Sequence, residues 1–158
     1  MNEVDQRVAN FLKFFSMVMV FGSLLYMYAY STDSSDHLNT TRDWLTEMPK
    51  AHIFYFGLGI FAIINLAMNF WINMYKKVKE IDEKSILFRS KRHKERLLMW
   101  FTFLMIGTNF QIASFVIYLA VIKINEDSAA SGYVYIPAVG FILFAGILIG
   151  LIRALFRN

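Results

Sequence analysis

The chain has 158 residues, of which 57% are hydrophobic, and its formal net charge is +4 at pH 7. It contains no cysteine, which excludes disulfides and thiolate metal sites. The longest polar stretches are about 20 residues, too short for a hydrophobic core of their own, so no separate soluble domain is expected. The length indicates a single domain over residues 1–158.

Four windows without any Asp, Glu, Lys or Arg divide the sequence. They contain 19, 25, 26 and 25 residues and cover positions 14–32, 51–75, 97–122 and 128–152. A helix needs roughly 20 apolar residues to cross the hydrocarbon core of a bilayer. We therefore predict an all-α fold, an integral membrane four-helix bundle with transmembrane helices at about 8–30, 51–75, 97–122 and 134–156.

The charges between these windows are distributed unequally. If the helices alternate in direction, 13 of the 16 basic residues lie on one side of the membrane, together with both termini. The other side has an acidic outer loop at 31–50. The positive-inside rule then places both termini and the basic loop 76–96 in the cytoplasm. The composition favours Phe, Ile, Asn and Lys, as AT-rich bacterial genomes do, so we expect the bacterial cytoplasmic (inner) membrane.

The second predicted helix has an asparagine stripe. Asn65, Asn69 and Asn73 recur every four residues and therefore share one helix face. Asn65 lies about 18 Å into this helix, and Asn109 lies about 18 Å into the next one, at 1.5 Å per residue. Consecutive helices usually pack side by side, so we predict an Asn65–Asn109 hydrogen bond, with Gln111, Thr108 or Ser23 as alternative partners. These amides either hold the helices together or line a polar path or a ligand site, for example for a quinone or a lipid.

The basic loop 76–96 has nine basic and four acidic residues. Such a loop sets the topology and attracts anionic headgroups of the inner leaflet, and it is also suited to docking an acidic partner protein. Nothing in it resembles a nucleic-acid recognition fold, so no nucleic acid is expected. The residues predicted to contact headgroups or a partner are Lys76, Lys77, Lys79, Arg89, Lys91, Arg92, Lys94 and Arg96.

The fourth predicted helix has a row of small residues, Gly146, Gly150 and Ala154, spaced four apart. Small residues at this spacing let another backbone approach closely. The row is expected to pack within the bundle or against another membrane subunit, including a second copy of the chain.

The three histidines do not predict a metal site. His37 lies in the outer loop near Asp33 and Asp36, but their spacing matches no zinc-ligand pattern. His52 is predicted to make interfacial hydrogen bonds, and His93 is predicted to lie solvated in the basic loop. No metal and no cofactor are expected.

These patterns favour a non-catalytic integral membrane subunit that assembles with other membrane proteins in a larger complex. The reason is that the four windows contain no ionisable Asp, Glu, Lys or Arg, the usual mark of chemistry inside a membrane. An alternative is a small channel or carrier with an Asn/Gln-lined path. A third hypothesis is a membrane enzyme that acts at the outer face through His37, His52 and nearby acids.

Overall fold

The computed structural model describes residues 3–30, 49–78, 81, 85–87, 89–124 and 130–156. Its elements are α1 (Glu3–Tyr30), α3 (Lys50–Lys77), α4 (Lys91–Ile124), the short 3-10 helix η1 (Ala130–Tyr133) and α5 (Tyr135–Phe156). Each of the four α-helices found in the described ranges is long and apolar enough to span a membrane. The predicted all-helical architecture is therefore confirmed.

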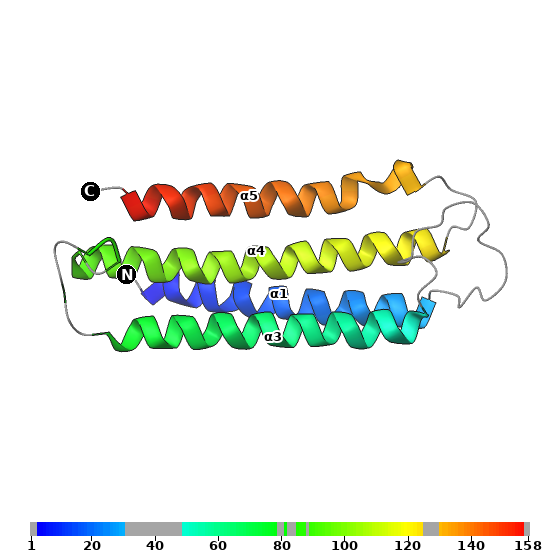
Figure 1. The fold of residues 1–158 in the computed structure, drawn as a ribbon, viewed down its shortest axis with the longest axis horizontal. Helices are drawn as coiled ribbons and strands as arrows, with labels where there is room; N and C mark the ends of the chain where they lie inside the picture. Colours follow the sequence, from blue (N-terminus) through cyan, green and yellow to red (C-terminus); the bar gives the residue numbers. More distant parts are fainter. Residues whose placement is uncertain are drawn as a thin grey trace.

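Successive helices run in opposite directions, as Figure 1 shows. The start of α1, the end of α5 and the segment between α3 and α4 consequently lie together at the left of that view. We call this the basic end, because Lys76, Lys77 and the Lys91–Arg96 start of α4 lie there. The other end of the bundle is called the opposite end.

The helix α4 forms the centre of the bundle. It packs against α1 and α3 on one side and against α5 on the other (Figure 1). All the substantial helix contacts of α5 are with α4, whereas α1, α3 and α4 contact one another. A helix with neighbours on both sides should be apolar all round, and the α4 sequence past Arg96 has this character.

Two apolar clusters hold the helices together. The cluster near the opposite end joins α1, α3 and α4 through Val20, Leu24, Met27, Ile53, Ala113, Val116, Leu119 and Ala120. The cluster near the basic end joins α3, α4 and α5 through Ile72, Tyr75, Leu97, Phe101, Leu151 and Ala154. Both clusters bury apolar surface between the helices. Buried positions between the two clusters hold polar side chains.

Two helices begin earlier than hydropathy predicts. The structure starts α1 at Glu3 instead of about residue 8, and it starts α4 at Lys91, six residues before the predicted transmembrane segment at 97–122. The added residues include Glu, Lys and Arg, which are good helix formers but too polar for the hydrocarbon core. Ser90 caps α4, since its Oγ accepts a hydrogen bond from the His93 backbone N–H at 3.1 Å.

The described part of the segment between α3 and α4 is attached to the helix ends. The Tyr75 hydroxyl donates a hydrogen bond to the backbone oxygen of Leu87. The Nε2 atom of His93 lies 2.9 Å from the backbone oxygen of Ile86. His93 is therefore buried, and the prediction that it is solvated is wrong, because the segment folds back over the start of α4.

Candidate functional site

A pair of asparagines lies at the centre of the bundle. The Nδ2 group of Asn65 donates to Oδ1 of Asn109 at 2.8 Å, and the Nδ2 group of Asn109 donates back to Oδ1 of Asn65 at 3.1 Å. Asn109 has no exposed surface and Asn65 is 6% exposed. Each carboxamide thus satisfies the donor and acceptor of the other away from water. This is the hydrogen bond that the spacing in the sequence predicts.

The helix α1 joins this pair through a serine. The Asn109 amide also donates to Oγ of Ser16 at 3.1 Å, and the Ser16 hydroxyl donates to the backbone oxygen of Lys13 at 2.8 Å. Ser16 is completely buried. Two of the three alternative partners considered from the sequence bond within their own helices, since Ser23 donates to the Val20 carbonyl and Thr108 to the Leu104 carbonyl.

A lysine extends the polar network toward the basic end. The Nζ group of Lys13 donates to Oδ1 of Asn69, and the Asn69 amide donates to the Asn65 carbonyl at 2.8 Å. Lys13 lies five residues beyond residue 8, where the predicted transmembrane part of α1 begins, which is about 7–8 Å along the helix. The sequence treats Lys13 as a flanking charge, but the structure directs its ammonium group between α1 and α3.

This network changes the inference from the charge-free windows. An ionisable side chain that faces the interior of a membrane bundle is a functional-site hypothesis by default. Neither Ser16 nor Lys13 was selected from the sequence. Lys13 was missed because an amphipathic lysine at a helix end usually extends toward the headgroups. A sequence cue was nevertheless present: Lys13 and Ser16 are three residues apart and share a helix face.

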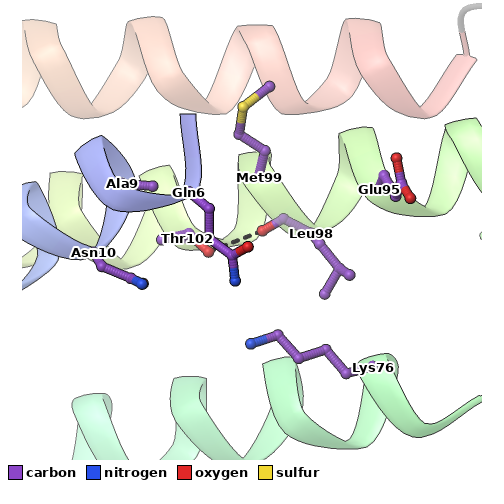
Figure 2. Close-up of a pocket in the computed structure, with 8 residues that line it drawn as sticks. All are labelled: Gln6, Ala9, Asn10, Lys76, Glu95, Leu98, Met99 and Thr102. Atoms are coloured by element: carbon purple, nitrogen blue, oxygen red, sulfur yellow. Dashed lines mark hydrogen bonds between the residues drawn. The ribbon is translucent and has the colours of Figure 1, made fainter. Parts of the chain in front are cut away.

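A cavity of about 80 Å³ continues the polar region to the basic end. Figure 2 shows that its walls come from the starts of α1 and α4 and from the end of α3. The Lys76 side chain extends toward the space between α1 and α4 (Figure 2). Lining residues are Gln6, Ala9, Asn10, Lys76, Glu95, Leu98, Met99 and Thr102.

The polar region does not extend through the bundle. Beyond Ser16 and Asn109, the apolar cluster near the opposite end fills the space between α1, α3 and α4, and Val20, Leu24 and Met27 are completely buried there. We call the cavity at the basic end together with the hydrogen-bonded network of Lys13, Asn69, Asn65 and Asn109 the polar inlet, which ends near the middle of the bundle.

The remaining predicted polar residues lie elsewhere. Asn73 is exposed, and its side chain makes no hydrogen bond to any residue that the structure describes. Gln111 faces α5, where Gly140 lies close to it and to Ser114. The Gln111 Oε1 atom is buried and accepts no hydrogen bond from the described part of the chain. The candidate path is therefore built from Asn65, Asn69 and Asn109, without Asn73 and Gln111.

The small-residue row of α5 divides into two parts. A Cβ atom on Gly150 would lie 2.1 Å from Cη2 of Trp100, and Ala154 is buried in the cluster at the basic end. Gly146 is exposed, and a Cβ atom there would have nothing within 4 Å. Gly150 and Ala154 thus pack against α4, whereas Gly146 lies on the free side of α5.

The predicted headgroup-binding residues have different environments. The Lys94 ammonium donates to the carbonyls of Lys76 and Val78, so it caps the end of α3. Arg89 and Arg96 are half-buried, and Lys79 lies outside the described residues. The exposed members are Lys76, Lys77, Lys91 and Arg92.

No group of three or more His, Cys, Asp or Glu side chains that could hold a metal ion occurs among the residues that the structure describes. His52 is exposed near the start of α3. His37, Asp33, Asp36 and the rest of the stretch 31–48 lie outside the described residues.

The chain matches no protein-family model, no curated protein and no solved structure. Its function must therefore be inferred from the chain itself.

Proposed function

We propose that this chain is a non-catalytic integral membrane subunit that assembles with other membrane proteins or with itself. It would be inserted through its four helices in a bacterial cytoplasmic membrane, with both termini in the cytoplasm. The length and hydropathy of the helices support the insertion. The excess of Lys and Arg at the basic end supports the orientation.

The observation that carries this proposal is the free side of α5. Among the described helices, this helix makes its substantial contacts with α4, and its other sides expose large apolar side chains such as Phe141, Ile142 and Ile149. Gly146 lies among them with open space around it. A glycine costs helix stability compared with alanine, and a small residue on an open transmembrane face is suited to close approach by another helix. The free side of α5 is therefore the proposed assembly surface.

Replacing Gly146 with leucine should prevent assembly without unfolding the chain, because the new side chain meets no atom of the chain within 4 Å of its Cβ. Because the chain has no native cysteine, an Ile149→Cys variant gives one crosslinking position on the same side of α5. We expect crosslinked species in native membranes from Ile149→Cys, and at least a severalfold loss of these species when Gly146→Leu is added.

Gly59→Leu is the matched control, since Gly59 lies in α3 and also has open space around its Cβ position. Crosslinking from Ile149→Cys should be retained in this variant. Equal losses from both leucine substitutions, or no crosslinked species at all in native membranes, would contradict an assembly role for α5.

The small carrier or channel is a second candidate, and the polar inlet favours it. Asn65, Asn69 and Asn109 point into this inlet together with the Lys13 ammonium. A fixed positive charge in a narrow path repels cations, so such a carrier should prefer anions. The apolar cluster near the opposite end would have to open during transport, because it closes the path in this conformation.

Flux measurements in liposomes test this second candidate. The Asn65→Leu/Asn69→Leu variant should abolish anion flux if the inlet is part of a transport path, while circular dichroism reports that the helices persist. Unchanged flux in this variant, or flux of cations in preference to anions, would exclude transport through the inlet. The outer-face enzyme remains a hypothesis without a described site, since most of its residues lie in 31–48.

A further inference from the structure

We propose that the cavity at the basic end binds a phosphate group, with the Lys76 ammonium as its cationic contact, and that an anionic phospholipid of the adjacent leaflet supplies this group. The inference rests on the cavity and its lining, and it is independent of the assembly role proposed for α5.

The first argument is the chemistry of the lining. Phosphate oxygens accept hydrogen bonds and carry negative charge, so a phosphate site needs donors and a cation. Lys76 supplies an ammonium group, and Gln6 and Asn10 each supply an amide N–H₂ group. Thr102 donates its own proton to the Leu98 carbonyl at 2.9 Å, so its hydroxyl is not counted as a donor here.

The second argument is electrostatic. The Lys13 ammonium, which binds Asn69 further inside the bundle, is close enough to Lys76 for the two charges to repel each other. An anion in the cavity would offset this repulsion. The one carboxylate of the lining belongs to Glu95, and Figure 2 shows it on the other side of Leu98 from the Lys76 ammonium. The Lys76 side of the cavity is therefore the side suited to an anion.

The third argument is size and place. One water molecule needs roughly 10–15 Å³ of such a cavity, so about 80 Å³ admits a tetrahedral phosphate but not the acyl chains of a phospholipid. The rest of the ligand must lie outside the cavity. Lys76 is the next-to-last residue of α3, and Gln6 lies in the polar first turns of α1, before its apolar part, so the cavity lies at the depth where phospholipid phosphates are found. A phospholipid, whose tails remain in the bilayer, meets both conditions.

The test uses the full chain in nanodiscs of phosphatidylcholine that contain a small fraction of phosphatidylglycerol, with bound lipids counted by native mass spectrometry. Lys76→Met should weaken retention of phosphatidylglycerol about fivefold, since one charge near a membrane surface contributes about 1 kcal/mol. Lys77→Met is the matched control. It removes the neighbouring lysine, which does not line the cavity, and should change retention less than twofold.

Glu95→Gln gives a test with the opposite sign. Removal of the carboxylate should strengthen retention of phosphatidylglycerol, whereas a generally basic surface predicts an equal gain when another carboxylate of the segment 76–96 is removed, for example in Glu83→Gln. Circular dichroism in the same nanodiscs shows that each variant is folded.

Inorganic phosphate distinguishes the two sources of the ligand. If it displaces the lipid in a Lys76-dependent way, the phosphate chemistry is supported. If phosphate binds with this dependence and phosphatidylglycerol is retained no better than phosphatidylcholine, the ligand is soluble and the lipid assignment is overturned. Equal effects of Lys76→Met and Lys77→Met, or no effect of either, would overturn the site itself.

Discussion

Replacing Asn109 with leucine is expected to lower the free energy of unfolding by about 1–3 kcal/mol, the cost of leaving buried polar groups unsatisfied. Asn109 makes hydrogen bonds with Asn65 on α3 and Ser16 on α1, and it has no exposed surface. Leucine has the same branch at Cγ but bulkier terminal groups, so the loss would come from the orphaned partners and from some overpacking, and no cavity is created. The measurement is unfolding of the purified chain in mixed micelles with increasing dodecyl sulfate, followed by circular dichroism.

The matched control is Asn73→Leu, which changes the same residue type at an exposed position of α3. It should leave stability unchanged within about 0.5 kcal/mol. The double variant Asn65→Leu/Asn109→Leu should recover part of the loss, because neither carboxamide is then left without its partner. A coupling energy of zero between the two sites would show that the pair contributes nothing to stability.

Replacing Gly150 with alanine should destabilise the packing of α5 on α4 by about 1–3 kcal/mol, the usual cost of overpacking. The new Cβ atom would lie 2.1 Å from the Trp100 ring, so the indole or the helix must move. The ring cannot yield freely, because Trp100 packs edge-on against Phe103 with ring centroids 6.0 Å apart. Thermal unfolding in detergent should report the change, and so should tryptophan fluorescence in a background where Trp44 and Trp71 are replaced by phenylalanine.

Gly146→Ala is the control for this prediction, since it adds the same methyl group to the same helix in open space. It should be neutral or stabilising, because alanine is the better helix former by about 1 kcal/mol in aqueous hosts. Replacing the indole with the smaller leucine side chain in Trp100→Leu should reduce the loss of stability caused by Gly150→Ala. If alanine is tolerated equally at both glycines, then α5 does not pack on α4 at Gly150 as the structure describes.

The helices and the Asn65–Asn109 pair are predictable from the sequence for the same reason. Both depend on distance along a helix axis, and a rise of 1.5 Å per residue converts residue number into depth. The windows without charge thus locate the helices. Asn65 and Asn109 lie at equal depth in neighbouring helices, and this predicts that they pair. The start of α1 was misplaced, and α4 extends before its transmembrane segment, because hydropathy measures fitness for hydrocarbon, whereas a helix continues as long as its residues tolerate the conformation.

The directions of side chains around each helix were less predictable. The Asn65, Asn69 and Asn73 stripe is one face by spacing alone, yet only the first two residues join the network. Gln111 lies near Asn109 in sequence but is turned by about 200° around α4, so it meets α5 instead. Which face of α4 receives which neighbour depends on the arrangement of all the helices, and a single helix does not encode it.

The basic character of one end and the apolar character of the four helices were thus determined by the sequence itself, because charge and hydropathy are properties of residues wherever they lie. The tertiary structure decided that Lys13 turns inward to Asn69, that His93 is buried, and that the substantial contacts of α5 with the other described helices are with α4. These outcomes follow from which polar groups find partners once the helices are side by side. The polar inlet is a property of three helices together, and no one of them contains it.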